Sequence, residues 1–335
     1  MTVKVGVIGV GVMGTTHLRT LGHDVPAAQV VALSDAIAES GHRLAEEVGI
    51  GTVYTDAHEL IGDPAVEAIV IASPADTHQE FVLACLELGK PCLCEKPLAS
   101  SPQAARAVVD AEAEIGHRLV QLGFMRRFDP GYLELKALLD RGEIGTPVLA
   151  HSTHRNPSAP PHFGSEMIVK DTVVHDVDTL RWLLGQEMAK ATVFTPKPTS
   201  RAPQGVSDPL LMLFETDAGR LITVEAFVNA QYGYDVGCEV VGESGVLSLP
   251  RPQPIPMGFQ ERFASAYAGE LQSWIDSVAQ GVAPTGASAW DGYAAAAVCE
   301  AAWDALRTRQ QTEVTLGTKP ELYAAAPAYS TVGKD

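Results

Sequence analysis

An acid, an imidazole and a second acid recur at helical spacing near the middle of the chain. Asp171, His175 and Asp178 lie in the segment 171–185, and in a helix, at about 100° per residue, they share one stripe with Trp182. The apolar stripe on the opposite side consists of Val173, Val177, Leu180 and Leu184. An imidazole flanked by carboxylates suits proton transfer, whereas a polar stripe on an amphipathic helix often only faces water. Other parts of the chain must decide between these interpretations.

A glycine motif near the start predicts a dinucleotide site. Gly9, Gly11 and Gly14 follow the apolar run 3–8 directly and open a helix-length segment. In that context the first glycine permits a tight turn, the second lets backbone approach a pyrophosphate, and the third allows close packing of helix on strand. The first helical N–H groups stabilise the anion. We therefore expect Val12 and Met13, at the start of that helix, to contribute to cofactor binding.

Asp35 predicts which cofactor binds. It ends the second predicted strand, 21 residues beyond Gly14, where a carboxylate accepts hydrogen bonds from ribose hydroxyls. The sequence between Asp35 and Arg43 contains no Lys or Arg to neutralise a 2′-phosphate. NAD is therefore favoured over NADP. Flavin adenine dinucleotide would use the same motif, but the sequence offers no second nucleotide-binding region for it.

Polar residues also follow two later strands. In an open α/β sheet, residues just beyond the carboxyl ends of strands line the ligand crevice. The residues in such positions that we expect to contact the cofactor are Ser73, Pro74, His78, Glu95 and Lys96. For His78 an anchoring or capping role is the alternative. Lys96 can hold a substrate oxygen as a charged donor, and Pro97 after it allows a cis peptide bond.

The elements that must position these residues follow from the alternation of apolar runs and helix-length segments. The first third predicts parallel βαβ units with strands at 3–8, 30–33, 68–72, 91–94 and 119–122, and helices at 13–21, 36–48, 77–88 and 102–115. Later segments predict a helix near 131–139, strand-rich sequence over 189–249, and helices at 262–280 and 287–307. The fold class is therefore α/β: a doubly wound Rossmann sheet over 1–123, then an α+β domain with a large, mostly antiparallel open sheet over 124–335.

Composition excludes several classes of protein. The 335 residues, 46% of them hydrophobic, are enough to bury two cores. A net charge of −17 argues against nucleic-acid binding. Because no apolar run reaches the ~18 residues that span a bilayer and no basic leader precedes the first strand, we expect a soluble cytoplasmic protein without membrane contact. The five cysteines are expected to be buried thiols, and we predict no metal site.

Together these motifs resemble the Gfo/Idh/MocA family of nicotinamide-dependent sugar and polyol oxidoreductases. The resemblance rests on the glycine motif 9–14, on Glu95-Lys96-Pro97 and on Asp171 with His175, and it covers essentially the whole chain. Finer segments, at 123–129, 154–157, 171–178, 232–243 and 288–293, are similar to bacterial inositol 2-dehydrogenases. The resemblance implies NAD-dependent oxidation of a cyclic polyol, myo-inositol to its 2-keto product (scyllo-inosose).

The resemblance also implies roles for individual residues. His175, with an ordinary pKa of about 6.5 for its imidazole, would take the hydroxyl proton, Lys96 would bind the reacting oxygen, and Asp171 would orient both. These three catalytic residues would contact the polyol together with Arg126, His154, Asn156, Asp178 and Tyr234. Structural alternatives are an ion pair for Arg126, a solvent-facing strand position for His154 and aromatic packing for Tyr234.

Other interpretations remain open. Lys170 beside Asp171, and His162 in the loop 160–164, put the identity of the polyol in doubt, and Trp182 has no assigned role. Another inositol isomer or a pyranose sugar is the alternative substrate. A non-catalytic nucleotide sensor is a third possibility, which the intact catalytic set disfavours. The family's open sheet implies a homo-oligomer, either a dimer or a tetramer.

Overall fold

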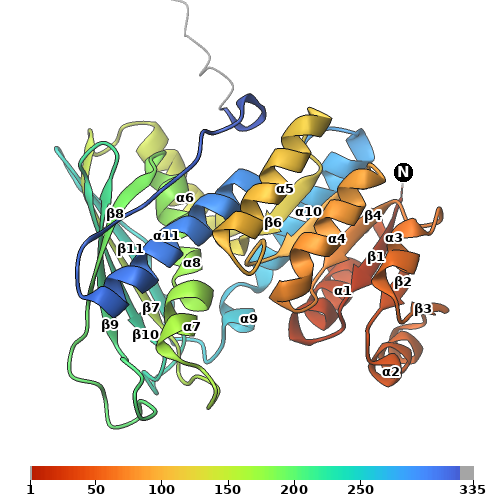
Figure 1. Cartoon of the computed structure of the whole chain (residues 1–335), viewed down its shortest axis with the longest axis horizontal. Coiled ribbons are helices and arrows are strands. Elements are labelled where there is room, and N and C mark those ends of the chain that lie inside the picture. The colour runs from red at the N-terminus through yellow and green to blue at the C-terminus, as the bar shows by residue number, and fades with distance from the viewer. Residues whose placement is uncertain (1, 325–335) are drawn as a thin grey trace, which may run out of the picture.

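The N-terminal part of the molecule is a doubly wound parallel sheet. The computed structural model describes residues 2–324 (Figure 1). Six strands pair in the order β3-β2-β1-β4-β5-β6, all parallel. Their bounds are β1 (Val3–Ile8), β2 (Ala28–Ser34), β3 (Thr52–Tyr54), β4 (Ala68–Ile71), β5 (Cys92–Glu95) and β6 (Val120–Gly123). Strand order reverses between β1 and β4, so a ligand crevice forms beyond their carboxyl ends. The predicted Rossmann architecture is confirmed.

Helices cover both faces of this sheet. They are α1 (Val12–Asp24), α2 (Ala38–Val48), α3 (Ala57–Gly62), α4 (Ala75–Glu87) and α5 (Pro102–Ile115). The prediction for α5 is correct to the residue because its ends carry strong signals: the Ser101 hydroxyl caps Ala104 N–H, Pro102 opens the helix, and Gly116 ends it in the left-handed region. Short β3 and α3 were not predicted.

Among residues 2–324, the C-terminal sheet has seven strands in the order β12-β11-β7-β10-β9-β8-β13. Their bounds are β7 (Pro147–Arg155), β8 (Met188–Phe194), β9 (Leu210–Thr216), β10 (Leu221–Phe227), β11 (Asp235–Gly242), β12 (Val246–Ser248) and β13 (Thr312–Glu313). All pairs are antiparallel except β7 with β10, which confirms the prediction of a mostly antiparallel sheet. Inward residues alternate with half-exposed ones along β7 and β10, which matches a sheet with one covered face.

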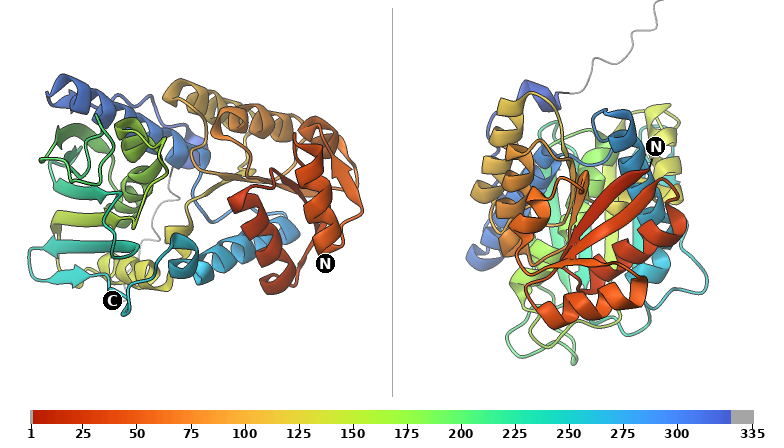
Figure 2. Two further views of the ribbon diagram at one scale, coloured as in Figure 1. Left: turned by 90° about the horizontal axis from the view of Figure 1, so that it is seen from below. Right: turned by 90° about the vertical axis from the view of Figure 1, so that its right-hand side faces the viewer.

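The covered face of the second sheet packs against α8 (Val174–Leu184) and α11 (Ala289–Thr308), which lie between it and the Rossmann sheet, and α6 (Pro130–Asp140) packs against α8 (Figure 1). Within the described residues, no helix covers the opposite face (Figure 2). Shorter elements are η1 (Met125–Phe128), α7 (Ser165–Met167), the π-helical turn η2 (Ile168–Thr172), α9 (Phe259–Arg262) and η3 (Glu321–Tyr323).

One helix departs from the predicted division of the chain at residue 123. Helix α10 (Ala264–Gln280) returns to the N-terminal sheet and lies beside α1 (Figure 2). Leu271, Trp274 and Ile275 share a buried cluster with residues of β1 and α1. Helix α10 thus covers part of the N-terminal sheet although it lies beyond residue 123 in the chain, and the division at residue 123 stays a prediction.

Two expectations from composition can be compared with the fold. The five cysteines are free and buried, as predicted. In the part of the chain that the structure describes, no helix is long and apolar enough to cross a membrane.

Candidate active site

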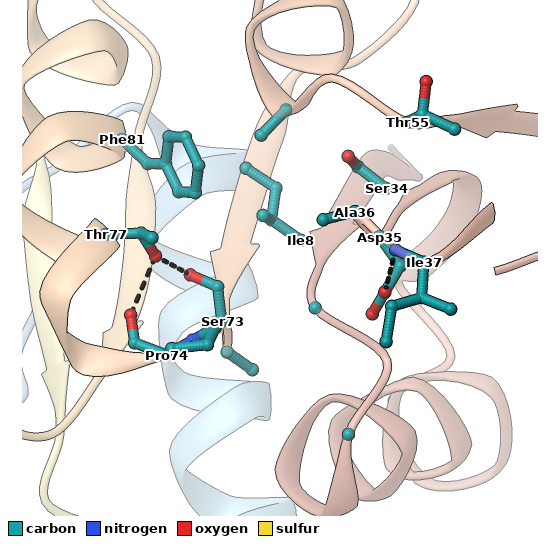
Figure 3. Close-up of a pocket in the computed structure, with 14 residues that line it drawn as sticks. Ile8, Ser34, Asp35, Ala36, Ile37, Thr55, Ser73, Pro74, Thr77 and Phe81 are labelled. Atoms are coloured by element: carbon teal, nitrogen blue, oxygen red, sulfur yellow. Dashed lines mark hydrogen bonds between the residues drawn. The ribbon is translucent and has the colours of Figure 1, made fainter. Parts of the chain in front are cut away.

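The glycine motif opens a cleft of about 480 Å³ at the carboxyl ends of β1, β2 and β4 (Figure 3). Gly9 has φ +86°, and a Cβ there would lie 2.6 Å from the Ala72 carbonyl oxygen. A Cβ at Gly14 would overlap the Gly9 carbonyl, whereas around Gly11 nothing lies within 4 Å. The first and third glycines thus close the strand-to-helix turn, and the second leaves the backbone open to a ligand. These residues fit a bound pyrophosphate.

Asp35 stands on the opposite wall of this cleft from Ser73 and Pro74 (Figure 3). Its carboxylate accepts hydrogen bonds from Val10 N–H at 2.9 Å and Ile37 N–H at 2.8 Å, one on each oxygen. Each oxygen keeps a free lone pair for a ribose hydroxyl. None of the described residues that line the cleft is a Lys or Arg. The cleft fits NAD better than NADP, in agreement with the sequence.

The residues that follow β4 divide between the cleft and the interior. Ser73 and Pro74 line the cleft, and the Thr77 hydroxyl bonds both the Ser73 hydroxyl at 2.7 Å and the Pro74 carbonyl at 2.8 Å (Figure 3). His78 lines neither this cleft nor the cavity described below, contrary to the predicted cofactor contact. Its ring is buried, with Nδ1 2.7 Å from the Pro97 carbonyl oxygen and Nε2 2.9 Å from that of Ser73. His78 therefore holds backbone, which is the anchoring alternative.

The predicted cofactor contacts at the start of α1 differ in where their side chains lie. Val12 is 66% exposed, and its side chain lines neither cavity. Met13 reaches the second cavity. Glu95 also lines that cavity, but its two oxygens bond His17 and Lys96 N–H. The predicted contacts of Glu95 and Val12 with cofactor therefore stay predictions.

A second cavity, of about 250 Å³, lies between the two domains. Elements far apart in the sequence build it. Its lining residues are Met13, Glu95, Lys96, Met125, His154, Asn156, Phe163, Asp171, Thr172, His175, Tyr234, Phe259 and Tyr267. The structure thus brings together Lys96, Asp171, His175, His154, Asn156 and Tyr234, six of the eight residues predicted to contact a substrate.

Lys96 and Asp171 meet across this cavity. The Lys96 ammonium donates to Asp171 Oδ1 at 2.6 Å and to the Asp171 carbonyl oxygen at 3.1 Å. Lys96 comes from the end of β5, and its peptide bond to Pro97 is cis. Asp171 belongs to the π-helical turn η2, and α8 begins only at Val174, so the segment 171–185 is not one regular helix, which was the condition for the shared stripe. The wider turn shifts Asp171 relative to His175 around the helix axis.

His175 is half-buried at the start of α8. Its ring packs at 6.0 Å from Phe124 and 6.3 Å from His154, and its Nδ1 is buried without a hydrogen-bond partner among the described residues. Burial, reinforced by the charges of Lys96 and Arg126, lowers the pKa of His175 well below its ordinary value. The imidazole is therefore neutral at pH 7 and able to accept a proton, and its pKa lies further from neutrality than the sequence suggested.

Asp176, which the sequence analysis did not select, is the hub of a buried network behind His175. Its fully buried carboxylate accepts from Arg126 at 2.8 Å, the Ser152 hydroxyl at 2.8 Å and His154 Nδ1 at 2.7 Å. Burial raises the pKa of Asp176, but the charge of Arg126 and the hydrogen bonds from His154 and Arg126 more than offset it and leave the pKa below its ordinary range. The network fixes the cavity wall that β7 contributes.

His154 faces the cavity from the inner side of β7 and is not a solvent-facing strand residue. Burial, with the nearby Arg126 and Lys96 charges, lowers the pKa of His154 despite the opposing carboxylate of Asp176. Its Nε2 lies 3.3 Å from the Tyr234 hydroxyl. Both side chains can therefore present neutral hydrogen-bonding groups to a ligand.

Arg126 and Asp178 do not reach the cavity wall, although direct substrate contact was predicted for both. Arg126 is fully buried, its guanidinium donates to Asp176 Oδ1 at 2.8 Å, and its Nη2 lies 3.0 Å from His154 Nδ1. Asp178 is also fully buried and receives both Arg127 Nε at 2.9 Å and Arg127 Nη2 at 2.6 Å. Arg127 pairs in addition with Asp291 at 3.1 Å. In this arrangement both residues support the site from behind, because each pairs with an oppositely charged protein group, Arg126 with Asp176 and Asp178 with Arg127.

The three residues of uncertain role lie away from the chemistry. Lys170 pairs with Glu166 at 2.9 Å and Glu300 at 2.6 Å, which directs its charge away from Asp171. His162 is exposed and does not line the cavity, whereas its neighbour Phe163 does. The ring of Trp182 packs under the Arg127 guanidinium at 6.0 Å.

Comparison with known proteins identifies the family of the chain. Residues 3–124 match the oxidoreductase family with an NAD-binding Rossmann fold, and residues 132–248 match the GFO/IDH/MocA C-terminal domain. Inositol 2-dehydrogenase 3 of Saccharopolyspora erythraea is 48% identical over 96% of this chain and 98% of its own length. The chain belongs to the GFO/IDH/MocA oxidoreductase family. It is an NAD-binding oxidoreductase.

Solved structures of family members resemble this one closely. Myo-inositol dehydrogenase from Lactobacillus casei, solved with NAD(H) and myo-inositol, is 36% identical with a TM-score of 0.93, covering 96% of this chain and 100% of that one. Apo scyllo-inositol dehydrogenase from the same organism is 26% identical with a TM-score of 0.86, covering 93% and 98%. Family members of this fold thus include enzymes named for different inositol isomers.

Proposed function

We propose that the protein oxidises one hydroxyl of a cyclic polyol, myo-inositol, to the corresponding 2-keto-inositol with NAD as hydride acceptor. The observation that carries this proposal is the direct contact of Lys96 with Asp171 in a cavity that His175 also lines. The cavity shares the carboxyl ends of the Rossmann strands with the cofactor cleft. The inositol 2-dehydrogenase name of the 48% identical relative supports the substrate.

Three side chains carry the proton chemistry. Neutral His175 takes the proton of the reacting hydroxyl, a step that contributes roughly 10²- to 10⁴-fold. The Lys96 ammonium holds the same oxygen and stabilises the alkoxide that develops. Asp171, 45% exposed on its side chain, orients Lys96 and connects it to solvent. Bound NAD supplies the chemistry of hydride acceptance.

Neutral polar groups on the C-terminal side recognise the other hydroxyls. Asn156 Oδ1 is buried and has no hydrogen-bond partner among the described residues, so it offers an acceptor to a substrate hydroxyl. His154 Nε2 and the Tyr234 hydroxyl lie beside it on the same wall. Met13, Phe163 and Phe259 supply apolar surface for the ring carbons. This mixture suits a compact molecule with several hydroxyls.

A substrate panel tests the proposal. Purified protein is assayed for NADH formation with myo-, scyllo- and chiro-inositol and with glucose, and the oxidised carbon of the product is identified by NMR. We expect myo-inositol to give the highest kcat/KM. A preference for scyllo-inositol would favour the second candidate substrate, which the similarity to scyllo-inositol dehydrogenase supports. Binding of NAD without turnover of any polyol would refute the enzymatic proposal.

We further propose that the uncovered face of the C-terminal sheet joins copies of the chain into a dimer or tetramer. Apolar side chains stand out from this face; Phe194, Leu211 and Leu221 are 51%, 41% and 39% exposed. They would be buried in a two-fold interface. Sedimentation of the wild type and of Leu211→Lys tests this. We expect dissociation of the variant; a monomeric wild type would refute the assembly.

We place the working enzyme in the cytoplasm, where reducing conditions keep its five buried thiols free. The charge of −17 supports the absence of nucleic-acid partners. Cell fractionation with detection of the native chain tests the location.

A further inference from the structure

A buried histidine on α1 connects the cofactor-binding helix to the catalytic lysine. We propose that His17, acting through Glu95, is a positioning residue that fixes Lys96 in the geometry needed for hydride transfer. The proposal rests on the proposed dehydrogenase function. It assigns a role to His17, which touches neither the cofactor cleft nor the substrate cavity.

An unbroken line of hydrogen bonds carries the proposal. His17 Nε2 lies 2.7 Å from Glu95 Oε1, and the other oxygen of Glu95 accepts from Lys96 N–H at 3.2 Å. The Lys96 side chain then reaches Asp171 Oδ1 at 2.6 Å. His17 is fully buried, and Glu95 nearly so. The line thus begins inside the Rossmann domain and ends across the cavity on η2.

The charge on Glu95 makes His17 necessary. Burial raises the pKa of Glu95, but the hydrogen bond from His17 and the charge of Lys96 lower it below its ordinary value. The carboxylate therefore stays ionised in a place where an unpaired charge is costly. Without His17, Glu95 Oε1 would lose its side-chain partner. The carboxylate would then turn toward the Lys96 ammonium and compete with Asp171 for it.

A core histidine with a purely structural role is the alternative. The His17 ring packs edge-on against Tyr267 at 5.9 Å, and its Nδ1 has no hydrogen-bond partner among the described residues. Its one described side-chain hydrogen bond therefore goes to Glu95. Tyr267 itself lines the cavity, as Glu95 does. Both residues that the His17 ring contacts are therefore part of the site.

The position of His17 in α1 couples cofactor and lysine. The helix begins at Val12, where its N–H groups face the expected pyrophosphate, and His17 lies little more than one turn later. A second buried histidine, His78 on α4, holds the carbonyl of Pro97 at 2.7 Å. The segment Glu95–Pro97 is therefore held from two helices that both begin at the cofactor cleft.

Matched variants of α1 test the proposal. In His17→Gln the amide nitrogen occupies the place of Nε2 and can still donate to Glu95, whereas His17→Leu cannot. His23→Gln, on the exposed side of the same helix, is the control. We expect His17→Leu to lower kcat with myo-inositol by about 10- to 100-fold, because a displacement of the catalytic lysine by roughly 1 Å has an effect of that size. We expect His17→Gln to stay within about 5-fold of the control, and the Kd for NAD to change little in either variant.

An isotope effect separates positioning from damage to the fold. With polyol deuterated at the reacting carbon, slower hydride transfer in His17→Leu should raise the primary isotope effect on kcat. The fraction of active protein is counted by NAD titration. If this fraction falls in parallel with kcat and the isotope effect stays unchanged, the proposal is overturned. A kcat of His17→Leu equal to that of His23→Gln would overturn it too.

A structural measurement keeps the test independent of the substrate. If the wild type oxidises no polyol, the proposed function fails, and the crystal structure of His17→Leu with NAD decides the positioning role alone. Separation of Lys96 Nζ and Asp171 Oδ1 beyond 3.5 Å would support it. Retention of the 2.6 Å contact would overturn it.

Discussion

The Asp176 network makes a quantitative prediction about stability. Asp176→Asn removes the negative charge that faces Arg126 at 2.8 Å, in a place where both side chains are at most 1% exposed. Removing one partner of a buried pair leaves the other charge uncompensated and costs about 3–5 kcal/mol. With about 2.1 cal/mol/K of unfolding entropy for each of the 335 residues, that loss lowers Tm by about 4–7 °C.

Calorimetry with two further variants checks the reasoning. Arg126→Met combined with Asp176→Asn removes both charges. The one amide oxygen of Asn can still accept from the Ser152 hydroxyl while its amide nitrogen faces His154 Nδ1, so we expect the double variant to recover about 2 kcal/mol or more. Glu47→Gln breaks the exposed pair with Arg19, where both side chains are 55% exposed, and should leave Tm unchanged within error. An Asp176→Asn protein within about 1 kcal/mol of the wild type would refute the uncompensated-charge argument.

The catalytic and cofactor residues make three further predictions. Lys96→Met should abolish turnover while the Kd for NAD, measured by fluorescence titration, is retained; normal turnover would remove Lys96 from the mechanism. Asp35→Ser should weaken NAD binding and relax the rejection of NADP, and unchanged kcat/KM ratios for the two cofactors would show that other groups decide the preference. Because His175 must be deprotonated to act and its pKa is lowered, kcat/KM should fall with acid only below pH 6.5. An acid limb centred above pH 6.5 would contradict that environment.

The positions of functional residues at the carboxyl ends of strands could be predicted from the sequence. The places of Gly9, Asp35 and Lys96 follow from chain order, because parallel strands deliver their carboxyl ends to one edge of the sheet. His78 shows the limit of this argument. It follows β4 as predicted, but the direction of its ring depends on the Pro97 carbonyl, which a different strand supplies.

The buried network behind the site could not be predicted because its partners are non-local. Asp176 adjoins His175 in sequence, yet its hydrogen-bond partners come from η1 and from β7. The same holds for Asp178, whose partner Arg127 lies 51 residues away. Apolar periodicity also gives no signal for the π-helical turn at Ile168–Thr172, which carries Asp171. Pairing across the fold, rather than local pattern, decides which acids reach the cavity.

The role of His175 as the catalytic base is tested most directly by NADH formation from myo-inositol by the wild type and by His175→Gln, each saturated with NAD at pH 7. If His175 is the base, the wild type turns over and the variant loses roughly 10²- to 10⁴-fold in kcat. Equal rates for the two proteins would exclude His175 as the base, and no NADH from the wild type with any cyclic polyol would exclude the dehydrogenase activity.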